Sequence, residues 1–436
     1  MSILNRIPII NSLINDQGFL RYFKNTSWLF FLKALRGFNT LIIGVILARY
    51  LGPNDYGILS YSLAFIFLFS SIAKMGLDTI VVRDLVKGNS NNDKILGTSF
   101  MLRLFGSFFI FLITLIISYF IHDTQEKDIV FVLSFTLLFL SFSVFDFYFQ
   151  AKVLMKLSAY SNIIAVIFSI LLKLILVYYK ASLEVLVYAF LLEHIILSCA
   201  YLYFYFKNGS TLINWQYNKQ IAISLMRDSF PLLLSSVFIV VYMKIDQIMI
   251  NSLLSSIEVG KYAAAAMLSE GFYFFPMIVA ISLFPAIINA KESSKEKYHD
   301  RMKRLYQLMF YSAIFLSILI SVFSNLIIST FFGAEYLDAS NILRIHIWAC
   351  VFVFIGVAST RWLITENLQL YSTVMTAIGA ISNIILNYIL IPKYGIVGSA
   401  WATVISYGLS GYFLYFIFEK TRSNFYLVNK SIFSIR

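Results

Sequence analysis

Charged residues interrupt long apolar runs at several points of this sequence. Lys33 and Arg36 lie in one such run, and Lys74 and Asp78 lie in the next. The same pattern returns further along the chain at Lys173, Glu193, Lys244, Asp246, Glu270 and Arg344. A charge at the centre of a lipid bilayer costs about 2.5 kcal/mol or more, so it normally faces a partner or a water-filled cavity. Because the basic residues outnumber the acidic ones, we expect an interior suited to an anionic group.

The composition is typical of a protein that crosses the membrane many times. Of the 436 residues, 60% are hydrophobic and 13% are charged, whereas soluble domains are about half apolar and one quarter charged. A membrane-spanning helix needs about 20 mostly apolar residues. The runs that meet this requirement are 27–48, 58–82, 99–121, 129–150, 158–179, 183–206, 229–252, 262–288, 307–330, 342–364, 368–391 and 396–418. The sequence therefore predicts an all-α polytopic membrane protein with about twelve transmembrane helices.

The distribution of Lys and Arg predicts which connections face the cytoplasm. One alternating set of connections carries most of these residues, whereas the other set holds only Arg49, Lys127, Lys180, Lys261 and Lys393. Cytoplasmic loops carry the excess of basic residues in membrane proteins. We therefore expect an even number of spans and two cytoplasmic termini. The net charge of +12 follows from this rule, so no nucleic-acid partner is expected.

A polar segment near the midpoint separates two sets of six spans, which predicts two six-helix lobes around a central cleft. The loops LGPNDYG (51–57) and LSSIEVG (254–260) keep Leu, an acidic residue and Gly at the same spacing, which favours two repeats of like orientation. The predicted parts are a cytoplasmic interfacial segment at 1–26, an N-lobe at 27–206, a cytoplasmic linker at 207–228, a C-lobe at 229–418 and a cytoplasmic tail at 419–436.

Helical spacing indicates which polar residues share a face of a span. Lys33, Arg36, Thr40 and Gly44 recur at steps of three or four and form one stripe. Arg36 either faces the cleft, where its planar guanidinium suits a phosphate, or extends to the lipid phosphates, as Lys33 could do closer to the end of the helix.

Further charges could be neutralised by neighbours or by the interface. Lys74 and Asp78 are four residues apart, so we predict an internal ion pair between them. Lys173 either reaches the interior or extends to the outer interface. The cationic candidates for binding an anion are Arg36, Lys33, Lys74, Lys173, Lys244 and Arg344.

Carboxylates within the spans are candidates for coupling to an ion. Asp246 shares a helix face with Tyr242, while Lys244 is offset by two residues and need not pair with it. Asp246 either contacts a cation or has a structural role. Glu270 could exchange protons if its access to water alternates. The candidates for coupling are Asp246, Glu270, Asp78 and Glu193.

Prolines and asparagines add expectations about the helices. Pro231 is predicted to open the seventh span, where a missing N–H is harmless. Pro276 and Pro285 are predicted to kink the eighth span. Asn383 and Asn387 share a face of the eleventh span, which suits either hydrogen bonds between helices or contacts with sugar hydroxyls.

The sequence contains no constellation that favours an enzyme. It has four histidines without metal-ligand spacing, no phosphate-cradling loop and no nucleophile elbow. Cys199 and Cys350 both lie inside predicted spans. We therefore expect no cofactor, no metal and no catalytic residue, and an ATPase or glycosyltransferase activity has no support.

Three segments resemble a known family. ILARYLGPNDYGILSYSLA (46–64) is similar to the first-loop signature of bacterial polysaccharide exporters and oligosaccharide flippases, and DQIMINSLLSSIEVGKYAAA (246–265) resembles its second-lobe equivalent. SNIILNYILIPKYGIVGSAWATVIS (382–406) resembles the late-span signature. Because these segments lie in both lobes, the resemblance covers essentially the whole chain. It is greatest to the O-antigen flippase branch of the superfamily that also contains multidrug extruders and peptidoglycan-precursor flippases.

This resemblance implies a transporter that moves undecaprenyl-pyrophosphate-linked oligosaccharide from the cytoplasmic to the outer leaflet by alternating access. It implies a bacterial inner-membrane location, coupling to H⁺ or Na⁺, contact with membrane lipids, and a polysaccharide polymerase and chain-length regulator as partners. A multidrug or cation antiporter is the first alternative, although a basic interior disfavours cationic cargo. A membrane polymerase or ligase is the second, but the outer loops are short for such an enzyme.

Overall fold

The computed structural model describes residues 17–88 and 92–433, and these residues are almost entirely helical. Its first half contains α2 (Gln17–Ala73), α3 (Leu77–Lys87), α4 (Asn92–Ser118), α5 (Thr124–Ser134), η2 (Phe135–Ser143), α6 (Val144–Ala151), α7 (Met155–Tyr178) and α8 (Leu183–Lys207). Its second half contains α9 (Lys219–Leu253), α10 (Ser256–Glu270), η3 (Gly271–Tyr273), α11 (Phe274–Ser293), α12 (Lys295–Val322), α13 (Ser324–Phe331), η4 (Ala334–Tyr336), α14 (Ala339–His346), α15 (Ala349–Thr365), α16 (Gln369–Gly408), η5 (Leu409–Phe413), α17 (Leu414–Ile417), η6 (Glu419–Thr421) and α18 (Arg422–Phe433).

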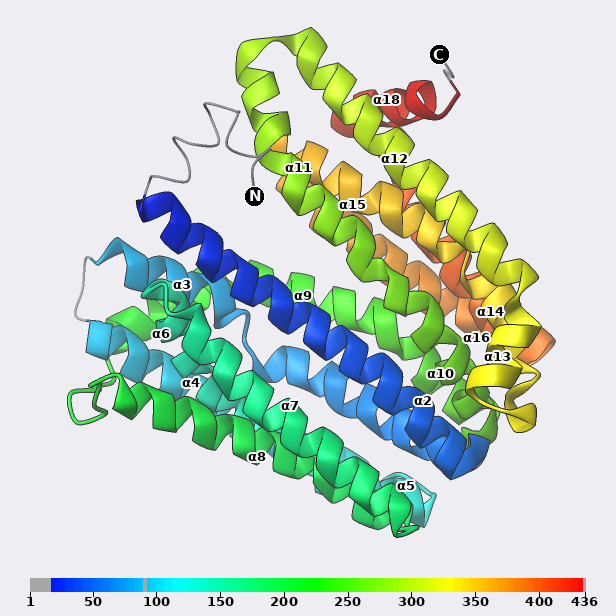
Figure 1. Ribbon diagram of the computed structural model, residues 1–436, viewed down its shortest axis with the longest axis horizontal. Helices are drawn as coiled ribbons and strands as arrows, with labels where there is room; N and C mark the ends of the chain where they lie inside the picture. The colour runs from blue at the N-terminus through cyan, green and yellow to red at the C-terminus, as the bar shows by residue number, and fades with distance from the viewer. Residues whose placement is uncertain (1–16, 89–91, 434–436) are drawn as a thin grey trace, which may run out of the picture. The chain divides into compact units, whose positions relative to one another are not determined.

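Ten helical stretches of the described residues are long and apolar enough to cross a membrane. The two longest, Leu35–Lys87 and Gln369–Ile417, have 53 and 49 residues, which is about twice the length that a bilayer requires. Each breaks at a glycine with positive φ, at Gly52 (φ 73°) and Gly395 (φ 60°), a conformation that glycine adopts without strain. In Figure 1, α2 turns back on itself near its middle. When both arms of each broken stretch are counted, the prediction of an all-α fold with about twelve spans is confirmed.

The chain forms two compact units. Of the described residues, the first unit contains 17–43 and 66–236, and the second contains 44–65 and 237–433. The ends of the first two spans that adjoin the loop 51–57, residues 44–65, therefore pack with the second unit, although the sequence placed them in the predicted N-lobe. The cause of this packing is a close contact between two helices, each of which has a glycine at the point of contact.

Gly57 and Gly260 form that contact. A Cβ added to Gly57 would lie 1.7 Å from the carbonyl oxygen of Ser256, and one added to Gly260 would lie 2.0 Å from the carbonyl oxygen of Pro53. No larger residue fits either position without a shift of the backbone. The two glycines are the matched residues of the loops 51–57 and 254–260, so their spacing in the sequence reflects a direct packing requirement.

A Gly57→Ala variant is therefore expected to be less stable by about 1–3 kcal/mol, the usual cost of overpacking. The measurement is the midpoint of thermal unfolding of the purified protein in detergent. Gly37→Ala is the matched control, because a Cβ at Gly37 meets nothing within 4 Å and alanine favours a helix more than glycine does. Equal midpoints for Gly57→Ala and the unmodified protein would contradict the close packing.

One local prediction is corrected by the structure, and the predicted terminal segments are described in part. Pro231 lies inside α9 and does not open the helix, because α9 already begins at Lys219. The predicted C-terminal tail contains the helix α18, which packs on α12. Of the predicted N-terminal segment, residues 1–16 lie outside the described part, and α2 begins at Gln17.

The eighth predicted span is interrupted by a short 3₁₀ turn. α10 ends at Glu270, and Gly271–Tyr273 forms this turn before α11. The turn includes Phe272, which lies four residues before Pro276. In a helix, the ring of a proline clashes with the carbonyl group four residues before it. The interruption thus lies where the sequence predicted a kink.

Candidate functional site

A polar network in the first unit surrounds Arg36. The Arg36 guanidinium donates a hydrogen bond to Oδ1 of Asn162 on α7. Asn162 is buried, and its Nδ2 donates to the carbonyl oxygen of Ser158 at 2.8 Å and to the hydroxyl of Tyr201 at 3.2 Å. A guanidinium has five N–H donors, so this neutral partner leaves most of the donors of the exposed Arg36 side chain available to a ligand.

The predicted ion pair between Lys74 and Asp78 is wrong, because Asp78 pairs with Arg103 of α4. Arg103 is 1% exposed, and it also donates to the carbonyl oxygen of Lys74 at 3.2 Å and to the hydroxyl of Ser143. Arg103 lies within the predicted span 99–121, where a charge needs partners. A buried charge is retained when several partners surround it, and Arg103 meets that condition.

Lys74 is consequently left without a carboxylate partner. Among the residues that the structure describes, no carboxylate oxygen lies within 4 Å of its ammonium group. Its charge interacts with those of Arg36, Arg103 and Asp78, and Asp146 of α6 interacts with Arg36. This cluster contains three basic and two acidic side chains, so the first unit holds a surplus of positive charge around Arg36 and Lys74.

Lys173 and Glu193 were predicted for different roles, and the structure pairs them with each other. The ammonium of Lys173 on α7 lies 3.2 Å from Oε2 of Glu193 on α8. Ser169 also donates to Glu193, and the Lys173 ammonium lies 3.7 Å from the ring centroid of Phe190. Lys173 is 4% exposed, so its charge is neutralised within the first unit.

In the second unit, Lys244 and Glu270 also pair with each other. The ammonium of Lys244 on α9 lies 3.1 Å from Oε2 of Glu270, the last residue of α10. Asp246 is two residues away from Lys244 and is not its partner, an outcome that the offset in the sequence left open. The two carboxylates of this region therefore have different surroundings, one charged and the other neutral.

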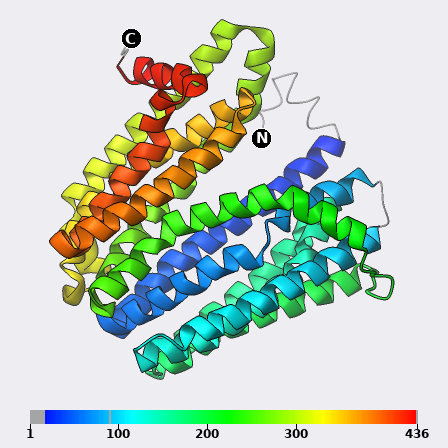
Figure 2. The same cartoon turned by 180° about the vertical axis from the view of Figure 1, so that it is seen from behind.

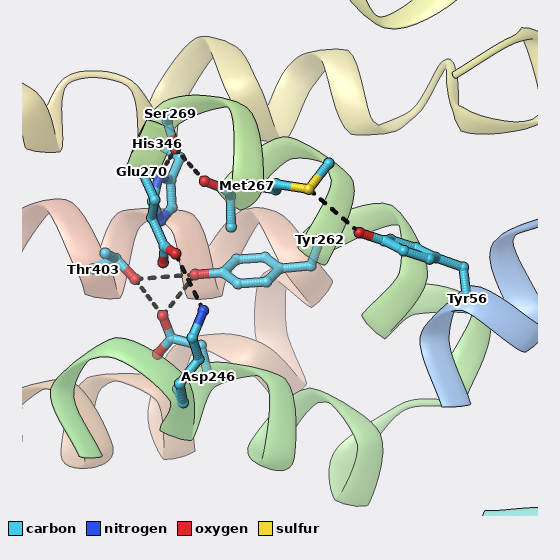
Figure 3. A network of polar contacts seen from close by, with 10 residues as sticks. Tyr56, Asp246, Tyr262, Met267, Ser269, Glu270, His346 and Thr403 are labelled. Carbon is cyan, nitrogen blue, oxygen red and sulfur yellow. Dashed lines mark hydrogen bonds and ion pairs between the residues drawn. The ribbon is translucent and has the colours of Figure 1, made fainter. Parts of the chain in front are cut away.

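Asp246 is buried among three neutral hydrogen-bond donors, of which Figure 3 labels Tyr262 and Thr403. Its Oδ2 accepts from the hydroxyl of Tyr262 at 2.6 Å and from the hydroxyl of Thr403 at 2.7 Å. Its Oδ1 accepts from Nδ2 of Asn387 at 2.6 Å. Within the described ranges, no Lys, Arg or His nitrogen lies within salt-bridge distance of this carboxylate.

Two helical hairpins bring these four residues to one level. Asp246 and Tyr262 each lie eight residues from Leu254, where the chain turns between α9 and α10. Asn387 and Thr403 each lie eight residues from Gly395, where α16 turns back. Eight residues of helix correspond to about 12 Å, so both hairpins carry their polar pair at the same depth.

The network around Asp246 also retains capacity for further ligands. Among the described residues, Oδ1 of Asn387 and Nδ2 of Asn383 are buried without a hydrogen-bond partner. Amide groups can be assigned in either orientation, and carboxylate, amide and hydroxyl oxygens are the ligands of hard cations. The residues that could hold a proton or a small cation are therefore Asp246, Asn387 and Thr403.

The two remaining candidates do not join these networks. Arg344 is exposed on α14, and its backbone carbonyl accepts a hydrogen bond from Ser321 at 3.0 Å. The side chain of Lys33 lies outside the described part of the structure. For Asn387 the sequence left two alternatives open, hydrogen bonds between helices and contacts with sugar hydroxyls. In the structure its amide donates to Asp246 of α9, which is a hydrogen bond between helices.

Several residues of these networks were not singled out from the sequence. Asn162, Asp146 and Arg103 each lie in a predicted span or at its edge, but their partners come from other helices. For Tyr262 and Thr403 a signal was present, because both lie in the segments 246–265 and 382–406 that carry the family resemblance. Tyr262 lies as far from the turn at Leu254 as Asp246 does, and Thr403 lies as far from the turn at Gly395 as Asn387 does. These equal spacings in the sequence would have placed each pair at the same level.

Comparisons with known sequences identify a family. The sequence model of the family described as polysaccharide biosynthesis protein matches residues 22–291, more than half of the chain. The model of a second family, MatE, matches residues 231–389.

Curated relatives match parts of the chain. An uncharacterized membrane protein of Methanocaldococcus jannaschii is 31% identical over 189 residues, which are 42% of this chain and 43% of that protein. Agl15 of Haloferax volcanii, a probable low-salt glycan biosynthesis flippase, is 27% identical over 208 residues, which are 47% of this chain and 41% of that protein. The matches thus span less than half of the length of these relatives.

Solved structures share the fold over nearly the whole chain. An inward-facing multidrug resistance MATE family transporter of the MOP superfamily has a TM-score of 0.70 at 15% identity and covers 91% of this chain and 96% of its own. The lipid II flippase MurJ in an inward closed conformation has a TM-score of 0.66 at 19% identity, with 94% and 90% covered. The fold of this chain is therefore that of MOP-superfamily proteins.

Proposed function

This chain belongs to the polysaccharide biosynthesis protein family, and we propose that it is a flippase for lipid-linked oligosaccharide. The proposed cargo is an undecaprenyl-pyrophosphate-linked repeat unit of O-antigen or a similar surface polysaccharide, moved from the cytoplasmic to the outer leaflet by alternating access. The name of the relative Agl15, a probable glycan biosynthesis flippase, supports this class of cargo.

The observation that carries the proposal is the surplus of positive charge around Arg36 and Lys74. Arg36 has a neutral partner, Asn162, and Lys74 has lost its expected partner Asp78 to Arg103. Basic side chains that lack carboxylate partners favour an anionic ligand, and pyrophosphate offers oxygens that match the fork of a guanidinium. A basic site that is shared between two cations also allows the cargo to leave, because no single tight pocket holds it.

Asp246 is the residue that we propose for coupling to an ion. Its carboxylate is buried and receives only neutral donors in the described structure. A desolvated carboxylate without a fixed countercharge favours binding of a proton or Na⁺. Glu270 and Glu193 are less suited to this role, because Lys244 and Lys173 neutralise them.

The cell context follows from the same proposal. We propose a bacterial inner membrane location with both termini in the cytoplasm, as the distribution of basic residues predicts. The partners that would act on the product are a polysaccharide polymerase and a chain-length regulator.

The test is translocation by the purified protein in proteoliposomes. Undecaprenyl-pyrophosphate-linked oligosaccharide with a fluorescent label on the sugar is placed in both leaflets, and a membrane-impermeant reductant bleaches the outer pool. Protein-dependent loss of more than half of the signal is expected, because inner-leaflet cargo reaches the reductant. Loss of half of the signal with and without protein would overturn the proposal.

A second candidate, extrusion of cationic compounds, rests on the match of the MatE family model to residues 231–389. The same proteoliposomes distinguish the two functions, because a cationic dye replaces the labelled lipid in a parallel assay. We expect no protein-dependent movement of the dye, since the surplus of charge around Arg36 and Lys74 repels cations.

A further inference from the structure

The second unit contains an apolar pocket with a volume of about 500 Å³. Its walls come from α12, α15, α16, the π-helical turn η5 and the C-terminal helix α18. Among the lining residues are Trp348, Phe352, Trp401, Tyr412, Ile432 and Phe433, and no charged residue lines it. Figures 1 and 2 show α12 and α18 close together in both views. The pocket thus combines residues from four separate parts of the chain.

The helix α18 is fixed in place by side-chain hydrogen bonds from neighbouring helices. The hydroxyl of Tyr306 on α12 donates to Oδ1 of Asn424 at 2.6 Å, and Nδ2 of Asn424 donates to the hydroxyl of Ser359 on α15 at 3.1 Å. The hydroxyl of Tyr412 donates to Oδ1 of Asn429 at 2.6 Å. These bonds hold the start and the middle of α18 against the second unit.

The end of α18 is capped from α12. Nε2 of Gln307 donates to the carbonyl oxygen of Ser431 at 3.1 Å, and the hydroxyl of Tyr311 donates to that of Ile432 at 2.9 Å. The last carbonyls of a helix have no partner within the helix, so α12 supplies the missing donors. The wall that contains Ile432 and Phe433 is therefore positioned by hydrogen bonds from α12 and from Tyr412.

Another part of the lining contains a rare backbone feature. Leu409–Phe413 forms a π-helical turn, and such turns occur mostly as single bulges, frequently at functional sites. Gly411 in this turn lies so close to α15 that an added Cβ would be 2.6 Å from the carbonyl oxygen of Phe352. The bulge brings Tyr412 into the lining of the pocket while its hydroxyl bonds to α18.

We propose that this pocket binds one acyl chain of a membrane phospholipid. The helices α12, α15 and α16 contain predicted spans, so the medium beside them is lipid hydrocarbon. Apolar cavities stay free of water and accept apolar ligands, and about 500 Å³ lies within the range of pockets that hold drug-sized ligands, roughly 300–1,000 Å³. Trp401 is 49% exposed and Phe433 is 78% exposed, so the lining keeps apolar surface for an occupant.

An acyl chain is favoured over the tail of the proposed cargo for one reason. The pocket is built within the second unit, whereas the basic side chains that we propose for pyrophosphate, Arg36 and Lys74, belong to the first unit. The bound lipid is therefore a resident component that joins α18 to α12 and α15, and this inference does not depend on the identity of the cargo.

The first test measures lipid retained by the protein. Protein is reconstituted in vesicles of phosphatidylcholine and phosphatidylglycerol, extracted into mild detergent and examined by native mass spectrometry. One phospholipid per chain is expected for the unmodified protein, and at least tenfold lower occupancy for Val404→Phe, which places a ring in the pocket. Ile318→Phe is the matched control, because Ile318 is an exposed residue of α12 outside the lining, and it should retain the lipid.

Equal retention by Val404→Phe, Ile318→Phe and the unmodified protein would overturn the proposal. Retention of undecaprenyl-linked oligosaccharide in place of phospholipid, when both are supplied, would overturn the choice of occupant.

A second measurement leaves Val404 unchanged, in case Val404→Phe does not fold, and the one substitution in the lining, Trp348→Phe, keeps an aromatic ring there. Trp28, Trp215, Trp348 and Trp362 are replaced by Phe, and the protein is reconstituted in phosphatidylcholine with dibrominated acyl chains, which quench tryptophan fluorescence on contact. After extraction into lipid-free detergent, Trp401 should stay quenched. A tryptophan introduced by Ile318→Trp, with Trp401 also replaced by Phe, should recover its fluorescence. Equal recovery at both positions would contradict a retained lipid.

Discussion

An Arg36→Ala variant is expected to translocate lipid-linked oligosaccharide about 10- to 100-fold more slowly than the unmodified protein. Hydrogen bonds to charged groups contribute roughly 1.5–3 kcal/mol each, and about 1.4 kcal/mol corresponds to a factor of ten. Arg36 has a neutral hydrogen-bond partner, Asn162. Asp146, with which the charge of Arg36 interacts, keeps its hydrogen bonds from Gln150 and Ser158, so the fold should be retained. The measurement is the initial rate of translocation in proteoliposomes.

Two further variants separate charge from geometry at this position. Arg36→Lys keeps the positive charge but loses the planar fork, so its rate should lie between those of Arg36→Ala and the unmodified protein. Lys87→Ala removes one exposed positive charge from α3 of the same unit and should leave the rate unchanged. A normal rate for a folded Arg36→Ala/Lys74→Ala variant would refute the electrostatic binding of pyrophosphate.

The spans could be predicted from the sequence because their signals are local. Hydropathy and length determine each run of about 20 residues, and the two breaks at Gly52 and Gly395 fall between runs that composition alone separated. The close contact of Gly57 with Gly260 was present in the sequence only as a repeated spacing. Nothing in that spacing indicated that the two loops touch each other.

The ion pairs could not be predicted in the same way, because they depend on which helices become neighbours. The spacing of four between Lys74 and Asp78 allowed a pair, but Arg103 of another helix lies closer to the carboxylate. A long buried side chain from a neighbouring helix can take the place of a partner on the same helix. The periodicity of polar residues along one helix does not indicate such a contact. Lys173 with Glu193 and Lys244 with Glu270 are pairs of the same kind.

The network around Asp246 is an intermediate case. Its members lie at equal distances from two turns, and both turns were visible in the sequence as Leu254 and Gly395. Helical rise converts those equal distances into a common depth of about 12 Å. The sequence does not indicate that the two hairpins pack against each other. The hydrogen bond between Asn387 and Asp246 shows this tertiary contact.

An Asp246→Asn variant is expected to translocate cargo at a rate that no longer responds to an ion gradient. Asparagine has nearly the same shape and can still accept hydrogen bonds from Tyr262 and Thr403 through its amide oxygen, so the second unit should remain folded. It lacks the negative charge that we propose to hold the coupling ion. The measurement is the translocation rate with an imposed pH gradient, an imposed Na⁺ gradient or no gradient.

The unmodified protein should respond to one of the two gradients, and that gradient identifies the ion. Asp338→Asn removes an exposed carboxylate of the same unit and should preserve the response. Asp246→Ala should instead lower stability by about 1–3 kcal/mol for each donor left unsatisfied, because Tyr262, Thr403 and Asn387 would lose their common acceptor. If Asp246→Asn kept a full response to the gradient, the carboxylate would be a structural acceptor whose three hydrogen bonds join α9, α10 and both arms of α16.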